Sequence, residues 1–360
     1  MQTKPQRMHP TPASGCRLGA AAAMALLVAA AAASACAHEF CVSNATQLQN
    51  ALTDASDGGT YDGEDNFILL RAGVFSTGAA TGNGPFHYHG SSSRHIDIYG
   101  GYDAGCGSSS HDARDSILDG QHATQVLNVR SASGPIDMAY FTVRNGESTS
   151  AGAGLSMNSI AGDDGQATVS NLIIRDNHSS ASAGGIFMAT GPGQFIAVED
   201  SLIFGNSADS GNGAGNLLAT GAAAIANNTI TQNTTSLGGG TGGLRFSGAA
   251  GCSCGISANI IWNNTNVGLF LANSNASIRY NVIGTIDGAT PSNSTGNINL
   301  APQFVDAAAG NFHLQSDSPA IGLAPDTYGG YDAYGNPSPP FRSISDAGGL
   351  FATIFGDGFD

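Results

Sequence analysis

The chain has 360 residues, with 51 glycines, 7% aromatic residues and 11% charged residues, a composition that indicates short strands and many turns and excludes a mainly helical protein. The net charge is −15, no lysine follows Lys4, and the arginines from Arg71 to Arg342 are scattered singly, which excludes a nucleic-acid partner and disfavours anionic membranes. The length suits one extended solenoid, because the length of a solenoid is not limited by the radius of a single hydrophobic core.

The first 37 residues have the three parts of a secretory signal peptide: a basic start, an apolar run over 18–33, and small residues near a cleavage point. Cleavage is expected before His38, after Ala35-Cys36-Ala37, or before Cys36, after Ala33-Ser34-Ala35. A third alternative makes Cys36 a lipidated cysteine. All three predict export.

Export makes disulfides possible, and cleavage before His38 leaves four cysteines. We expect Cys41 to pair with Cys106, tying the N-terminal cap to the first coils. Cys252 and Cys254 are expected to form a tight bond in a turn. The alternative is that these two are metal ligands, although C-x-C alone is a weak zinc signal.

Residues 38–130 are predicted to form an N-terminal cap and the first coils. Asn44 to Gln47 has the spacing of a capping box, and it precedes an apolar helical face made of Leu48, Ala51, Leu52 and Ala55. Such a helix would shield the open end of a solenoid. Strand-like segments follow at 67–70, 95–99, 116–118 and 126–129.

Residues 131–286 contain a repeat. Four Ile-x-x-Asn segments begin at Ile174, Ile203, Ile230 and Ile261, separated by 29, 27 and 31 residues. Two further apolar segments in each repeat, one of them preceded by glycine, bring the strands to three per coil. This pattern predicts an all-β, single-stranded right-handed parallel β-helix. The strand-end asparagines are expected in left-handed turns, bonded to their copies in the next coil, and the glycines are expected to supply backbone freedom.

Residues 287–348 are predicted to form closing coils and a C-terminal cap. The stretch 302–321 contains PQF, FHL and SPAIG elements, and DAYGNP (332–337) and SDAG (345–348) follow. These elements resemble the end of bacterial β-helix proteins of the choice-of-anchor Q type, although 346–351 departs from that group's usual D-I-G-A-Y-E. The aromatic and acidic tail, 349–360, is interpreted either as a sorting or recognition segment or as a closing strand.

The Gly-Gly-Ile/Leu and Ile/Phe-x-x-Asn motifs also resemble those of polymorphic outer-membrane proteins, which are β-helical surface proteins and adhesins. Together the two resemblances imply a pectate-lyase-like solenoid that is secreted or held in the cell envelope, at the outer membrane or outer surface, of a Gram-negative bacterium. They imply an adhesin-like protein that recognises carbohydrate or a protein on another cell's surface. A structural spacer is a further alternative, and the sequence does not predict the oligomeric state.

Many β-helices cleave polysaccharides, so we searched for catalytic groups. Asp163-Asp164 is the only pair of adjacent aspartates in the sequence, and Arg175 and Arg245 are candidate bases for a Ca²⁺-dependent lyase. No two carboxylates recur at the same coil position in successive repeats. We therefore expect a non-catalytic binding protein without a cofactor, and a Ca²⁺-dependent polysaccharide lyase with an arginine base is the alternative.

Candidate ligand-binding residues are aromatic. An aromatic platform for sugars is predicted from Trp262, Phe204, Phe246 and Phe270, with core packing as the alternative for each. The weak candidates for a Ca²⁺ site are the carboxylates of the most acidic loop, Asp57, Asp62, Glu64 and Asp65. His87 and His89, which alternate within one predicted strand, are a second weak metal candidate.

Overall fold

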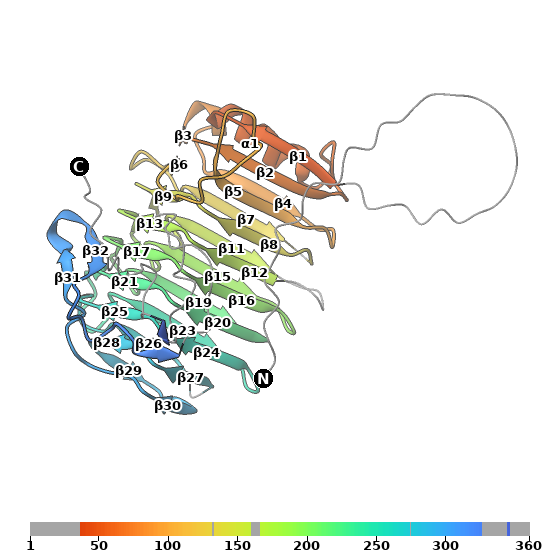
Figure 1. Cartoon of the computed structure of the whole chain (residues 1–360). Coiled ribbons are helices and arrows are strands. Elements are labelled where there is room, and N and C mark those ends of the chain that lie inside the picture. Colours follow the sequence, from red (N-terminus) through yellow and green to blue (C-terminus); the bar gives the residue numbers. More distant parts are fainter. Residues whose placement is uncertain (1–36, 132, 160–165, 274, 326–343, 346–360) are drawn as a thin grey trace, which may run out of the picture.

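The computed structural model describes residues 37–131, 133–159, 166–273, 275–325 and 344–345. The predicted signal peptide, Asp163-Asp164 and residues 349–360 lie outside these ranges. Parallel strands stack into a β-solenoid of about eight turns, which confirms the predicted parallel β-helix. Figure 1 shows the coils stacked from helix α1 (Ala45–Ala55) at one end to the last strands at the other.

Each coil contributes one strand to each of three long walls. Sheet A comprises β1 (Ala37–Val42), β2 (Asp65–Arg71), β5 (Ile96–Tyr102), β8 (Ile136–Ala139), β12 (Gln166–Ser170), β16 (Phe195–Glu199), β20 (Ala222–Ala226), β24 (Ser253–Ser257), β27 (Ala276–Arg279) and β30 (Asn293–Thr295). Sheet B comprises β3 (Gly73–Ser76), β6 (Ser116–Asp119), β9 (Thr142–Arg144), β13 (Ile173–Arg175), β17 (Leu202–Phe204), β21 (Thr229–Thr231), β25 (Ile260–Trp262) and β28 (Val282–Ile283).

Sheet C forms the third wall. It comprises β4 (Phe86–Gly90), β7 (Leu127–Ser131), β11 (Leu155–Ser159), β15 (Ile186–Thr190), β19 (Gly215–Ala219), β23 (Leu244–Gly248), β26 (Leu269–Leu271) and β29 (Ile286–Gly288). A short fourth sheet lies between sheets B and C and comprises β10 (Glu147–Ser148), β14 (His178–Ser179), β18 (Ser207–Ala208) and β22 (Thr234–Thr235). Inward side chains of the long sheets form one continuous apolar core.

The predicted capping helix is confirmed. Asn44 is its N-cap and accepts a hydrogen bond from the Gln47 backbone N–H, 3.0 Å away. The Gln47 side chain returns to the N–H and hydroxyl of Ser43 rather than to Asn44, so half of the capping box is displaced by one residue. The predicted apolar face of α1 is buried against the first coils and the 3₁₀ turn Ala79–Thr81. The helix therefore covers the apolar end of the core. Within the described residues, the structure has no helix that is long and apolar enough to span a membrane.

Two asparagine ladders connect neighbouring coils. The one predicted from Ile-x-x-Asn runs through Asn177, Asn206, Asn233 and Asn264, where each carboxamide donates to the carbonyl oxygen of the next at 2.9 Å. A second ladder, missed in the sequence, joins sheets A and B through Asn228, Asn259, Asn281 and Asn297 at 2.8 to 2.9 Å. Hydrogen bonds between buried amides thus stabilise the corners of the solenoid.

The left-handed turns lie one residue earlier than predicted. Positive φ angles occur at Asp176 (56°), Gln232 (56°) and Asn263 (54°), whereas the ladder asparagines that follow them have none. Asn145 aligns with Asp176 and has φ 54°, so it is a turn residue as well. The turn residue redirects the chain so that the next side chain points inward to its copy.

The repeated glycines serve close packing rather than backbone freedom. Neither Gly185 nor Gly243 has a positive φ, so the predicted role is wrong for both. A Cβ atom on Gly185 would lie 2.4 Å from the carbonyl oxygen of Ala214, and one on Gly243 would lie 1.9 Å from that of Gly268. Only glycine lets adjacent coils approach this closely.

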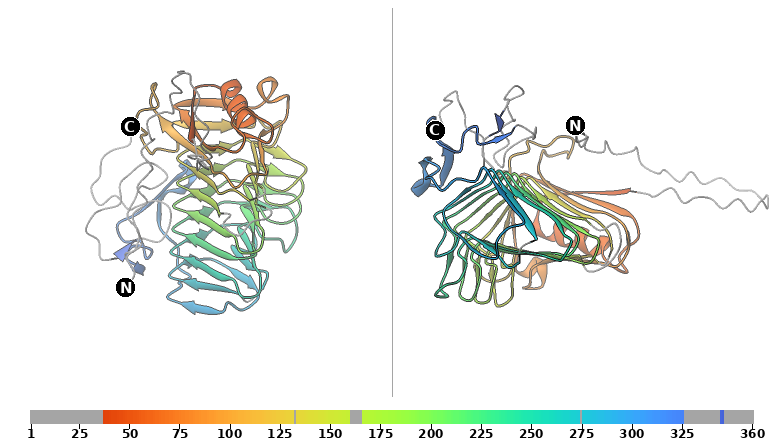
Figure 2. Two further views of the ribbon diagram at one scale, coloured as in Figure 1. Left: turned by 90° about the vertical axis from the view of Figure 1, so that its right-hand side faces the viewer. Right: turned by 90° about the horizontal axis from the view of Figure 1, so that it is seen from below.

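The C-terminal segment leaves the path of the coils. Residues 287–298 continue the solenoid through β30, whereas residues 299–325, the C-terminal strap, pack outside it (Figure 2). The strap contains an antiparallel pair, β31 (Phe304–Asp306) and β32 (Asn311–Leu314), joined by a 3₁₀ turn (Ala307–Ala309). A second antiparallel pair joins β33 (Ala324–Pro325) to β34 (Ile344–Ser345).

The strap covers apolar side chains on the outer face of sheet B. Phe312 is fully buried there with Ile173 and Leu202, and Leu314 and Ala320 pack with Ile260 and Val282. Sheet B is therefore buried on both faces over most of its length.

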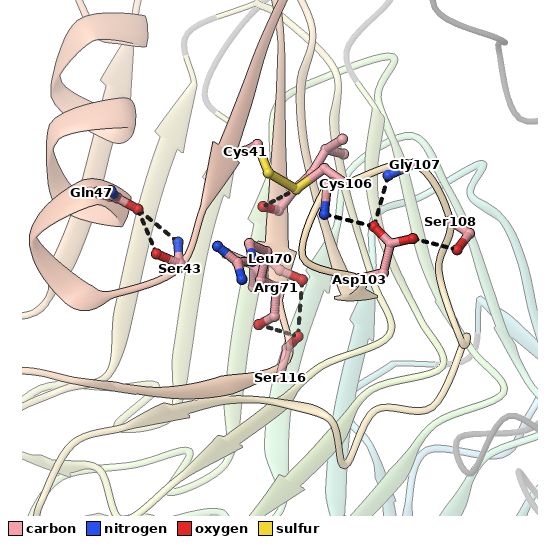
Figure 3. The surroundings of a disulfide bond; sticks show 12 residues. Cys41, Ser43, Gln47, Leu70, Arg71, Asp103, Cys106, Gly107, Ser108 and Ser116 are labelled. Atoms are coloured by element: carbon pink, nitrogen blue, oxygen red, sulfur yellow. Dashed lines mark hydrogen bonds between the residues drawn. A yellow bond between two sulfur atoms is a disulfide. The ribbon is translucent and has the colours of Figure 1, made fainter.

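The predicted disulfide between Cys41 of β1 and Cys106 is present, with Cα atoms 5.8 Å apart (Figure 3). Asp103 shapes the loop that carries Cys106 by accepting hydrogen bonds from Gly105, Gly107 and Ser108, and the Ser108 hydroxyl is the main cause of a lowered Asp103 pKa. The bond ties β1 to the β5–β6 loop. The structure also pairs Cys252 with Cys254.

Replacing both Cys41 and Cys106 by serine should lower the free energy of unfolding by about 3 kcal/mol, because this bond closes a long loop in the unfolded chain. Chemical denaturation measures the change. The matched control replaces Cys252 and Cys254, which are separated by two positions and close almost no loop. An equal loss in both double variants would contradict the loop-closure explanation.

Candidate ligand-binding site

The only tryptophan of the chain, Trp262, lines a hollow at the end of β25. Its indole projects from the outer face of sheet B and is half-buried. On one side it packs against the cluster that holds Leu314 and Ala320 of the strap. The strap therefore fixes an aromatic surface beside the hollow.

Glycine in the next coil creates the space. Gly284 follows β28 at the position aligned with Trp262, and a Cβ atom there would lie 3.5 Å from Cε3 of the indole. A larger side chain would extend over the ring. The hollow has a volume of about 270 Å³, close to the lower limit for small-ligand pockets. Its lining consists of Ile261, Trp262, Asn263, Asn264, Gly268, Gly284 and Thr285.

Polar groups at the hollow differ in their availability. The Asn264 amide donates to the Ile230 carbonyl as the last member of its ladder, and the Thr285 hydroxyl accepts from the Gly268 N–H at 2.7 Å. Asn263 occupies the left-handed turn and is exposed, so its carboxamide stands at the rim. The hollow thus combines a fixed aromatic face with one exposed amide.

The four aromatic residues do not form the predicted platform. Phe246 points inward from β23 and is fully buried, whereas Phe270 points outward from β26 of the same sheet. Phe204 lies on sheet B with Trp262, but its ring packs against Phe312, with the ring centroids 5.0 Å apart. Of the four, only Trp262 lines the hollow.

The candidate catalytic arginines are also separated. Arg175 projects from sheet B and pairs with Asp176, whereas Arg245 belongs to β23 of sheet C. Asp163 and Asp164 lie outside the described residues. Arg175 and Arg245 consequently cannot serve one reaction centre.

A charged pair that the sequence did not reveal lies near Arg175. Arg144 of β9 donates to Asp119 of β6 at 2.8 Å, and Asn145 donates to the same carboxylate at 3.1 Å. Burial alone would raise the pKa of Asp119, but the hydrogen bonds that it accepts outweigh burial and lower the pKa. The guanidinium and carboxylate neutralise each other, so this pair joins coils and offers no unpaired base.

The acidic loop does not converge on one point. Asp57 accepts from the Ser91 backbone and hydroxyl, which lowers the pKa of Asp57, and Asp62 accepts from the Gly58 N–H. Asp65 accepts from the His95 N–H, and the Glu64 backbone carbonyl accepts from the Asn66 amide. No group of three or more His, Cys, Asp or Glu side chains in the described ranges is placed to hold a metal ion. His87 and His89 project from the outer face of β4.

No protein-family model, curated protein or solved structure matches the chain. The functional argument therefore rests on the residues themselves.

Proposed function

We propose that this chain is an exported, non-catalytic β-helix protein of the cell surface or extracellular space that binds carbohydrate. The Trp262 hollow carries the proposal. A fixed aromatic face suits the apolar face of a sugar ring, and an exposed amide can bond its hydroxyl groups. The size of the hollow fits one sugar unit of a longer glycan rather than an extended polymer.

The sequence resemblances support the cellular setting. The signal peptide predicted in residues 1–37 supports export, and the resemblance to choice-of-anchor Q proteins supports a surface protein of a Gram-negative bacterium. Phe304 of PQF begins β31, FHL lies in β32, and Leu314 of FHL and Ala320 of SPAIG belong to the apolar cluster against which Trp262 packs. These segments therefore support one side of the hollow, whereas DAYGNP (332–337) and residues 346–348 of SDAG lie outside the described residues.

The binding test uses two variants that change the hollow in opposite ways. Trp262→Ala removes the aromatic face, and Gly284→Leu fills the hollow while keeping the indole. We expect each to weaken binding of a neutral oligosaccharide about tenfold or more, since stacking and access are lost. Isothermal titration calorimetry against a panel of neutral oligosaccharides measures the affinity.

Phe195→Ala is the matched control, because it removes a half-buried, outward-facing aromatic ring from sheet A. It should leave neutral-sugar affinity unchanged. Equal affinities in Trp262→Ala and the unchanged protein would overturn the assignment of this site.

A further inference from the structure

The outer face of sheet C carries cations without carboxylates in a strongly acidic protein. From β7 to β26 its outward side chains are Asn128, Arg130, Ser156, Asn158, Phe187, Ala189, Asn216, Leu218, Arg245, Ser247 and Phe270. We call this set the sheet C strip. Its six strands span about 24 Å at about 4.8 Å per strand. Among the residues that the structure describes, carboxylates border the strip only at its ends, where Asp57 lies near His89 and Asp287 follows Phe270 in register.

Both arginines of the strip are available to a ligand. Arg130 is exposed, and neither it nor Arg245 forms an ion pair in the part of the chain that the structure describes. By contrast, Arg114, Arg144 and Arg175 each have an aspartate partner. The strip therefore holds uncompensated positive charge on a chain of net charge −15.

Arg245 is held in position before any ligand arrives. Its Nη1 donates to Oδ1 of Asn216 at 3.2 Å, and its guanidinium carbon lies 6.0 Å from the centroid of the Phe270 ring. A guanidinium fixed by an amide and an aromatic ring keeps other N–H donors for a carboxylate or sulfate. Little ordering of this side chain is then needed on binding.

We propose that the sheet C strip binds an acidic polysaccharide lying along the axis of the solenoid. The arginines would bind the acidic groups of the polysaccharide. The outward rings of Phe187 and Phe270 would stack on the faces of its sugar rings, and the amides of Asn128 and Asn158 would form hydrogen bonds with its hydroxyl groups. Two arginines over about 24 Å are too few for a nucleic acid, whose binding requires many neutralised phosphates. The inference shares carbohydrate binding with the proposed function but uses a different face and different residues.

The test measures binding of polygalacturonate, a linear polyuronate, and of neutral dextran by affinity electrophoresis and calorimetry. Arg130→Gln and Arg245→Gln should each weaken polygalacturonate binding several-fold, and the double variant about tenfold or more, with little change for dextran. Affinity should fall on raising the salt concentration. Arg279→Gln is the matched control, because Arg279 is exposed on sheet A, where its Nε donates to the Ser277 hydroxyl.

Three results would overturn the proposal: unchanged affinity in the double variant, an equal loss in Arg279→Gln, or binding of a single-stranded oligonucleotide as tight as that of the polyuronate. The last result would indicate a general polyanion surface. Trp262→Ala separates the two sites, since it should leave polyuronate binding intact. Loss of neutral-sugar binding in that variant, with the polyuronate retained, would support both assignments.

Discussion

Asn206→Ala should lower the free energy of unfolding by about 4 kcal/mol, because it removes the middle of a buried ladder. Asn206 is fully buried, accepts from the N–H and the amide of Asn177, and donates to the Ile174 carbonyl and to Asn233. Alanine would leave these partners unsatisfied away from water. Urea denaturation followed by circular dichroism measures the loss.

Asn158→Ala is the matched control for the ladder. Asn158 is half-buried on the outer face of sheet C, where its amide donates to the Ser156 hydroxyl at 3.3 Å. Its replacement should change the free energy of unfolding by less than about 0.5 kcal/mol. A similar loss of unfolding free energy in both variants would mean that a ladder asparagine stabilises the fold no more than a surface asparagine does.

Phe312→Ala should release the C-terminal strap from sheet B while the coils stay folded. Phe312 is fully buried between Phe204 and Phe304, with ring centroids 5.0 and 5.3 Å away. Truncation of a buried phenylalanine costs about 3 to 5 kcal/mol, and here that cost falls on the packing of the strap against sheet B rather than on the core inside the coils. The strap is therefore the part that should detach.

Hydrogen exchange distinguishes local release from global unfolding. Amides of residues 299–325 should lose protection in Phe312→Ala, whereas those of the sheet A strands should keep theirs. Val305→Ala is the control, because Val305 lies in the same strap but is 51% exposed. Uniform loss of protection across all sheets would show that the strap is integral to the solenoid core.

The repeat spacing was sufficient to predict the β-helix, because stacked parallel strands place equivalent side chains above one another. Details within a coil were not predictable from the same spacing. The ladder asparagine and the residue with a positive φ are adjacent in sequence. The Ile-x-x-Asn repeat therefore does not determine which of the two adopts the left-handed conformation. Phe246 and Phe270 both sit beside apolar residues, and only the strand register places one inside and the other outside.

The sequence does indicate that the outer face of sheet B is buried. Its strands contain neighbouring apolar residues, as in Ile173-Ile174, Leu202-Ile203 and Ile260-Ile261, and such pairs indicate burial on both faces of a strand. The segment that supplies the cover lies far away in sequence and packs without any repeat. The Trp262 hollow was hidden for the same reason, since it depends on the strap and on the glycine of the next coil.

One titration tests the central claim, that the protein binds carbohydrate without cleaving it, most directly. Trp262 is the only tryptophan, so its fluorescence reports on the hollow alone while ultraviolet absorbance follows unsaturated products of cleavage. A panel of neutral and acidic glycans, with and without Ca²⁺, should include one that shifts the emission saturably with no rise in absorbance. Accumulation of unsaturated products, or an emission that no glycan changes, would contradict the account.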